Sequence, residues 1–213
     1  MTTTERAVPT PYGDGRLVVR RARRTAVTLL LSHGAGNGIE ARDLAALADA
    51  LPAQGVTVAL FEQPWRVAGR KIASPPATLD VGLHAAAGVL RARTPLVLGG
   101  RSAGARSAAR CARDLGAVGV LALAFPLHPP GRPERSRLDE LVGAGVPTLV
   151  VQGERDPMGT PEEFPETTDL TVVPSADHGL RVPARAELSQ AEALDLVVEA
   201  VLEWLVREVT GNP

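Results

Sequence analysis

The motif GGRSAG, residues 99–104, places Ser102 in a G-x-S-x-G pattern between an apolar run and a helical pattern. Small residues at such a junction permit a sharp, strained turn that exposes the serine hydroxyl. A serine hydroxyl is a weak nucleophile at neutral pH, so it needs a nearby base and a carboxylate that orients the base. The motif therefore predicts acyl-transfer chemistry at Ser102. The alternative is that this serine only caps a glycine-rich helix start.

The best candidate for the base is a histidine, and the chain has four: His33, His84, His128 and His178. For a serine at a strand-to-helix turn, the expected order along the chain is serine, acid, histidine. His33 and His84 precede the serine, and His128 follows the very next apolar run with no strand-end carboxylate in between. The order therefore selects His178 as the base.

The carboxylate that best fits between the serine and the histidine is Asp156, in QGERDP directly after the apolar run PTLVV. Glu154 in the same segment is a rival. Asp177 adjoins His178 in the sequence, but successive side chains generally diverge, so Asp177 is poorly placed to reach its neighbour's ring. We therefore predict Asp156 as the acid that orients the base.

Acyl transfer also needs N–H donors for the negative charge that develops on the carbonyl oxygen. One is ordinarily the backbone N–H after the nucleophile, here Ala103, and another comes from a loop at a neighbouring strand end. The loop SHGAGNG, residues 32–38, suits this role because glycine lets the backbone approach a substrate closely. We predict the N–H of Ala35 as the second donor. The alternative is that the glycines only make a tight turn.

Four further side chains at strand ends are predicted to contact the substrate: Arg101, Gln63, Trp65 and His128. Arg101 adjoins the nucleophile, and a charge at such a tight turn needs a partner if it is buried. We expect Arg101 to bind a carboxylate of the substrate. For the other three, structural packing is an equally good explanation.

Apolar runs alternate with helical patterns along the chain. The runs cover residues 26–32, 56–62, 95–100, 118–125, 147–153 and 169–174, and residues 17–20 are expected to form an edge strand. The clearest helical face carries Leu194, Val197, Val198, Val201 and Leu205. This alternation predicts an α/β fold with a mostly parallel sheet and helices on both faces.

The predicted site residues follow the apolar runs, and ligands of open parallel sheets bind at the carboxyl ends of the strands. No linker, internal repeat or low-complexity tract divides the chain, so residues 1–213 are predicted to form one domain. The loop over residues 125–137 is rich in proline, which forbids a regular helix across its middle.

Composition argues against several other functions. The chain has 23 Lys+Arg and 24 Asp+Glu, a net charge of −1, so no basic field favours nucleic-acid binding. Its longest apolar run is about half of the roughly 20 residues that cross a bilayer, so no membrane partner is expected. One cysteine and an N-terminus without an apolar stretch favour a cytoplasmic location.

No nucleotide or metal cofactor is expected. A G-x-G-x-x-G motif starting at Gly34 would need a glycine where Ile39 stands, and no G-x-x-x-x-G-K-[ST] motif occurs. Neither Cys111 nor the scattered histidines have the spacing of metal ligands.

With SHGAGNG, GRSAG, ERDP and ADHG in this order, the chain resembles the α/β-hydrolase superfamily, especially its small dienelactone-hydrolase-like members. The segments FEQPWRVAGRK, FPLHPPGRPE and QGERDPMGT look like the group that includes the third subunit of the nonspecific lethal histone-acetyltransferase complex. The resemblance implies nucleophile, acid and base at Ser102, Asp156 and His178. It also implies a minimal fold, because the loop over 125–137 is too short for an inserted lid domain.

These observations predict a serine hydrolase that cleaves an ester or thioester of a small acyl substrate. The alternative is a noncatalytic domain of the same fold that binds a protein partner or a small ligand at the same strand ends. The second hypothesis follows from the resemblance to a subunit of a chromatin complex.

Overall fold

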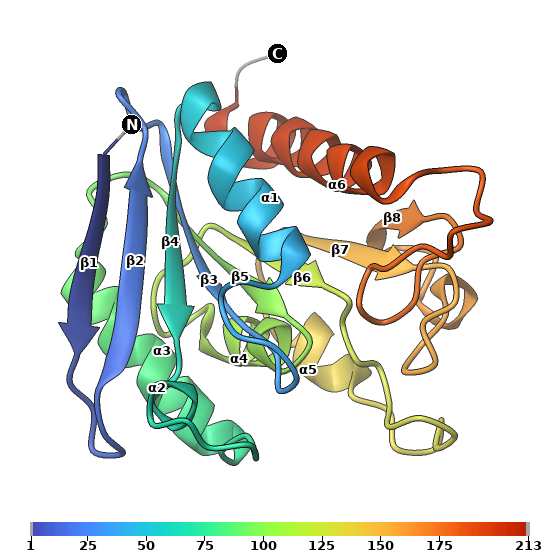
Figure 1. Ribbon diagram of the computed structural model, residues 1–213, viewed down its shortest axis with the longest axis horizontal. Helices are drawn as coiled ribbons and strands as arrows, with labels where there is room; N and C mark the ends of the chain where they lie inside the picture. Colours follow the sequence, from blue (N-terminus) through green and yellow to red (C-terminus); the bar gives the residue numbers. More distant parts are fainter. Residues whose placement is uncertain (1, 212–213) are drawn as a thin grey trace.

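Eight strands form one sheet at the centre of the protein (Figure 1), as seen in a computed structural model that describes residues 2–211. Residues 1, 212 and 213, which the one-domain prediction includes, lie outside the described residues. The strands are β1 (Thr2–Val8), β2 (Gly15–Arg21), β3 (Val27–Ser32), β4 (Val56–Glu62), β5 (Leu96–Arg101), β6 (Gly119–Leu123), β7 (Thr148–Gly153) and β8 (Asp169–Val173). Their order in the sheet is β1-β2-β4-β3-β5-β6-β7-β8.

The pairing of the strands confirms the predicted mostly parallel sheet. Strands β4, β3, β5, β6, β7 and β8 pair in parallel, whereas β2 is antiparallel to both β1 and β4. Residues 17–20 lie in β2, so the prediction that they form an edge strand is wrong. The outermost strand is β1, whose sequence TTTERAV is exposed or half-buried except at Val8. It has no apolar run by which it could be recognised.

Helices cover both faces of the sheet (Figure 1), with α1 and α6 on one face and α3 and α4 on the other. The helices are α1 (Arg42–Ala50), α2 (Pro64–Val67), α3 (Pro76–Leu90), α4 (Ala103–Cys111), α5 (Leu138–Val142) and α6 (Gln190–Leu205). Short 3-10 turns follow α1 at Leu51–Gln54 and precede β8 at Pro161–Glu163, and a π-helical turn at Val206–Thr210 follows α6.

The central strand β3 shows why its sequence is continuously apolar. Leu29 and Leu31 pack into the cluster that contains α1 and α6, whereas Leu30 packs into the cluster that contains α3 and α4. A strand covered on both faces needs apolar side chains at every position, because successive side chains point to opposite faces. The two clusters together form the core that holds the strand ends in place.

Helix α6 begins at a capping box in which Ser189 accepts from the N–H of Glu192. Its buried residues are Ala193, Val197, Val201, Trp204 and Leu205, of which Val197, Val201 and Leu205 belong to the predicted face. Leu194 and Val198, which the sequence places on the same face, are half-buried. The buried face of the helix is therefore rotated slightly about the helix axis from the predicted face.

The connection from β6 to β7 is short. Residues 124–137 form turns and loops, and the only helix there among the described residues is α5, which has five residues. As the prolines predict, no regular helix crosses the middle of this loop, and within residues 2–211 no lid covers the carboxyl ends of the strands. No helix within residues 2–211 has both the length and the apolar character needed to cross a membrane.

Candidate active site

Ser102 occupies a sharp turn between the end of β5 and the start of α4. Its backbone has φ of 53° and ψ of −111°, a strained combination for a residue other than glycine. The turn is held by the N–H of Ser102, which donates to Leu123 O at 2.9 Å. The serine is half-buried, so its hydroxyl remains reachable from solvent. The structure therefore shows the strained, exposed serine turn that the motif predicts.

Two glycines allow this turn to pack against the end of β3. A Cβ on Gly100 would overlap Ser32 O and stand 2.8 Å from the carbonyl carbon of Gly104. A Cβ on Gly104 would overlap the same Ser32 oxygen and stand 2.8 Å from His33 O. Backbone atoms cannot rotate away as side chains can, so the glycines at both ends of G-x-S-x-G are required by close contact with the backbone at the end of β3.

Three side chains from separate loops form one line of hydrogen bonds. Ser102 Oγ lies 2.9 Å from His178 Nε2, and His178 Nδ1 lies 2.7 Å from Asp156 Oδ2. Because a carboxylate only accepts, Nδ1 carries the hydrogen and Nε2 is free to accept the serine proton. The side chain of Asp156 is fully buried, and that of His178 is 23% exposed. The structure brings together the three residues that the chain order selects.

The Asp156 carboxylate accepts two further hydrogen bonds that hold it in place. The N–H of Met158 donates to Oδ1 at 2.8 Å, and Gln152 Nε2 donates to Oδ2 at 2.8 Å. Gln152 is fully buried and also donates toward Gly159 O and Phe125 O. Sequence reasoning missed Gln152; the only available signal was an amide at the end of an otherwise apolar strand.

The two rival carboxylates are occupied elsewhere. Glu154 Oε2 accepts from the N–H of Ser175 at 2.6 Å. Asp177 Oδ1 accepts from the N–H groups of Gly179 and Arg181, at 2.7 and 3.0 Å. Asp177 thus turns back on its own loop, as expected for a side chain that diverges from its neighbour.

The loop after β3 lies directly against the serine turn. A Cβ on Gly34 would stand 3.2 Å from Arg101 O and 3.3 Å from Ser102 Cβ. Ala35 is exposed in this loop, and Ala103 begins α4. Among the described residues, neither N–H donates to the backbone or to a side chain. Both are therefore available to an acceptor that enters the site.

His33, which precedes this glycine loop, is held as a neutral ring. Its Nδ1 lies 2.7 Å from Gly34 O, and its Nε2 accepts from the N–H of Gln63 at 3.0 Å. One nitrogen therefore donates and the other accepts, which only the neutral ring can do. Burial lowers the pKa of His33 in agreement with these bonds.

Comparison with known proteins identifies the family. The family described as "Alpha/beta hydrolase domain" matches residues 25–206. The chain belongs to this family. No curated protein sequence matches the chain.

Among the 210 residues from 2 to 211, no three or more His, Cys, Asp or Glu side chains are grouped so that they could hold a metal ion.

Solved structures with the same fold cover nearly the whole chain. An α/β serine hydrolase without a lid from Xanthomonas campestris is 21% identical, with a TM-score of 0.70, covering 95% of this chain and 94% of that one. A dienelactone hydrolase from Anabaena variabilis is 18% identical, with a TM-score of 0.73 and coverage of 97% and 98%. A serine hydrolase homologue from Coxiella burnetii is 20% identical, with a TM-score of 0.71 and coverage of 93% and 97%. At these identities the likeness shows the fold.

In this α/β-hydrolase domain, Arg101 has internal partners and not the open position expected of a substrate contact. Its side chain is 7% exposed, and Nε lies 3.2 Å from Asp43 Oδ2 on α1. Its Nη2 donates to the main-chain oxygen of His178 at 2.6 Å. Burial raises the pKa of the Asp43 carboxyl, and the charge of Arg101 opposes that rise. We therefore reassign Arg101 from substrate contact to a buried link between α1 and the histidine loop.

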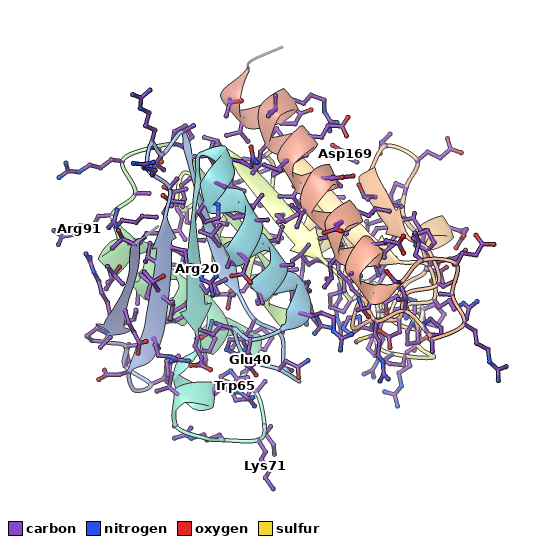
Figure 2. The ribbon with its side chains drawn as sticks, turned by 45° about the horizontal axis from the view of Figure 1, so that its top comes forward. Arg20, Glu40, Trp65, Lys71, Arg91 and Asp169 are labelled. Carbon is purple, nitrogen blue, oxygen red and sulfur yellow. The ribbon has the colours of Figure 1, made fainter. Side chains whose placement is uncertain are left out.

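Gln63 and Trp65 also lie inside the hydrolase domain, at 1% and 2% exposure. Gln63 Nε2 donates to Leu79 O at 3.0 Å, and the ring of Trp65 meets that of His33 edge-on at 5.5 Å. Figure 2 shows Trp65 at the end of the sheet that also carries Glu40. These contacts favour the structural explanation over the predicted contact with substrate.

His128 is likewise engaged by the protein, and its partners indicate a charged ring. Nδ1 lies 2.9 Å from Pro129 O, and Nε2 lies 2.8 Å from Glu163 Oε2. Both partners are acceptors, so both ring nitrogens donate, which requires the imidazolium. The Pro129 carbonyl and then Glu163 raise the pKa of His128 above its ordinary value of 6.5. The predicted substrate contact is replaced by an ion pair between two loops.

This ion pair predicts a pH-dependent contribution to stability. A raised pKa stabilises the folded state below the ordinary value, and that contribution is lost as the pH rises through the folded pKa. We expect His128→Gln to lower the free energy of unfolding by about 1 kcal/mol at pH 6, because Glu163 is partly solvated, and by less at pH 9. Urea unfolding at both pH values measures this, with His84→Gln as the exposed control. An equal loss at both pH values would contradict an imidazolium at His128.

Proposed function

We propose that this protein is a serine hydrolase that cleaves an ester or thioester of a small acyl substrate. The observation that carries the proposal is the line from Ser102 Oγ through His178 to buried Asp156, with separations of 2.9 and 2.7 Å. The geometry gives the serine a base, and it gives the base a partner that selects the productive tautomer.

The reaction proceeds in two halves. His178 Nε2 takes the proton of Ser102 as Oγ attacks the carbonyl carbon, and the carbonyl oxygen becomes negatively charged. The N–H groups of Ala103 and Ala35 are assigned to that oxygen. His178 then gives the proton to the leaving alcohol or thiol as its bond to the acyl carbon breaks. In the second half, His178 deprotonates water, which attacks the acyl carbon. His178 returns that proton to Ser102 Oγ as the bond between Oγ and the acyl carbon breaks, which releases the acid and regenerates Ser102.

The open strand ends allow direct access to the proposed site. No lid covers the strand ends within residues 2–211, so substrate reaches Ser102 without passing beneath an inserted domain. The lidless serine hydrolase and the dienelactone hydrolase with the same fold are consistent with this class of reaction. Arg101 is buried and paired with Asp43, so it is not assigned to bind a carboxylate of the substrate. The proposal therefore does not require the substrate to carry one.

A fluorophosphonate probe tests the proposal without knowledge of the substrate, because it reacts with an activated serine. We expect the wild-type protein to gain the mass of one probe, and peptide mapping to place it on Ser102. Ser102→Ala should gain none, and His178→Ala should react about 10² to 10⁴ times more slowly. Ser136→Ala, at an exposed serine of the 125–137 loop, is the control and should react like the wild type.

Absence of an adduct on folded wild-type protein would overturn the proposal. It would favour the noncatalytic alternative, in which the same strand ends bind a protein partner or a small ligand. Resemblance to the group of the nonspecific lethal complex subunit motivates that alternative, and purification of a stoichiometric partner would then be the next measurement.

A further inference from the structure

Two short loops rich in arginine lie together at the end of the sheet opposite Ser102. Arg21 ends β2, Arg23 and Arg24 follow it in the β2–β3 turn, and the α3–β5 loop carries Arg91 and Arg93, so that Arg-Ala-Arg occurs in each segment. All five side chains belong to exposed residues. Within residues 2–211, none of them has a carboxylate oxygen within 4.0 Å.

A hollow of about 380 Å³ lies between these two loops. Arg21, Arg91 and Arg93 line it, together with the threonines Thr25, Thr28, Thr57 and Thr94. Among the described residues, no aspartate or glutamate lines this hollow. Two other surface hollows that contain arginines also contain glutamates, Glu154 and Glu187 in one, Glu187 and Glu192 in the other. A neighbouring hollow, lined by Arg23 and Arg24, also has no aspartate or glutamate among the described residues that line it. Of these two hollows with uncompensated positive charge, the one between the loops is also lined by threonine hydroxyls.

The threonines supply hydroxyl donors in fixed positions. Thr25 and Thr57 form one pair and Thr28 and Thr94 another, each with 2.8 Å between hydroxyl oxygens. A pair uses one of its two hydroxyl hydrogens, which leaves the other available to a ligand. Thr28 and Thr57 are register partners on β3 and β4 and are 4% and 3% exposed. The sheet thus holds these hydroxyls at the base of the hollow.

From this arrangement we infer that the hollow binds the phosphate group of a small anionic ligand. Arginine presents several N–H donors in a planar fork that matches the oxygens of a phosphate, and hydroxyls complete such a site. The volume is within the range of pockets for small molecules. A flat or extended polyanion would meet the arginines but would not reach the recessed hydroxyls of Thr28 and Thr57, so the recess favours a small ligand.

The inferred site is separate from the candidate active site. The hollow lies where β3, β4 and β5 begin, and Ser102 follows the last residue of β5. Six residues of strand span roughly 20 Å. In Figure 2, Arg91 points outward from the side of the molecule, away from Trp65 and Glu40 at the other end of the sheet. The inference therefore stands or falls independently of hydrolysis at Ser102.

Isothermal titration calorimetry with inorganic pyrophosphate tests the site on the full chain at constant ionic strength. We expect wild-type protein to bind one pyrophosphate, and Arg91→Gln/Arg93→Gln to weaken binding at least about tenfold. Arg132→Gln/Arg135→Gln makes the same charge change on another exposed loop and should leave affinity within about twofold. Thr94→Val keeps the charge and should weaken binding about three- to tenfold.

The result that overturns the inference is equal weakening in both arginine double variants, because attraction would then depend on net charge and not on the hollow. No effect of Thr94→Val would likewise show that the hydroxyls do not take part. Binding of a single-stranded oligonucleotide without any binding of pyrophosphate would also overturn it, in favour of an extended polyanion surface. Circular dichroism and melting curves confirm that each variant is folded before titration.

Discussion

Replacing Asp156 with asparagine is expected to slow fluorophosphonate labelling of Ser102 by about 10³- to 10⁴-fold. The carboxylate accepts from His178 Nδ1 at 2.7 Å, which leaves Nε2 without a hydrogen and able to accept from Ser102. An asparagine amide of the same shape can instead donate toward Nδ1, so the hydrogen moves to Nε2. The base then faces the serine with a hydrogen where a lone pair is needed. The labelling rate measured by intact mass reports this directly.

Asp177→Asn is the matched control, because it makes the same chemical change next to His178 without touching its ring. Asp177 Oδ1 binds only backbone N–H groups of its own loop. We expect its labelling rate to stay within a few-fold of wild type. A small effect of Asp156→Asn, or similar effects of both variants, would be incompatible with the role assigned to Asp156.

Replacing Asp43 with alanine is expected to lower the free energy of unfolding by about 3–5 kcal/mol. The side chain of Asp43 is fully buried, and that of its partner Arg101 is 7% exposed. Removing the carboxylate leaves the positive charge of Arg101 in the interior without its counter-charge. The free energy cost of removing Arg101 from water is then no longer offset by attraction to Asp43. Urea unfolding followed by circular dichroism measures the change.

Asp49→Ala provides the control for this prediction. Asp49 also pairs with an arginine, Arg20, but its side chain is 65% exposed. Water can replace that partner, so the expected loss is at most about 1 kcal/mol. Equal losses in the two alanine variants would show that burial of the Asp43–Arg101 pair has no special consequence.

A double substitution separates the stabilising effect of this pair from its position beside the histidine loop. Asp43→Leu/Arg101→Met removes both charges and fills similar space, so we expect stability to return to within about 2 kcal/mol of wild type. It does not restore the hydrogen bond from Arg101 to His178 O. Labelling of Ser102 should therefore stay slower than in wild type, and full recovery would show that the bond does not position His178.

The fold and the three central residues could be predicted because both depend on patterns along the chain. Continuous apolar runs mark strands covered on both faces, and parallel pairing brings the ends of those strands to one edge. Ser102, Asp156 and His178 each follow such a run, so their order was enough to select them. Their separations required the structure, since spacing along the chain does not give distances across loops.

The residues around that centre could not be predicted, because their contacts depend on how loops and helices fold together and leave no pattern in the sequence. Arg101 is held by Asp43 on α1, far earlier in the chain, and nothing near Arg101 in the sequence indicates that pairing. Gln152 meets Asp156 only because the intervening turn folds back. His128, which follows β6, pairs with Glu163, which follows the next strand, β7. A polar side chain that follows a strand can form a hydrogen bond or an ion pair with a neighbouring loop as readily as with a substrate.

The polar outer strand β1 also has a consequence for how the protein behaves when concentrated. An unpaired strand edge exposes N–H and C=O groups that can capture a strand from another molecule. In β1 the first six residues are TTTERA, they are mainly exposed, and they include the charges of Glu5 and Arg6. Charged and polar side chains at an edge disfavour the close, dry stacking that such capture requires. The strand with the weakest sequence signal is thus the one that protects the sheet against aggregation.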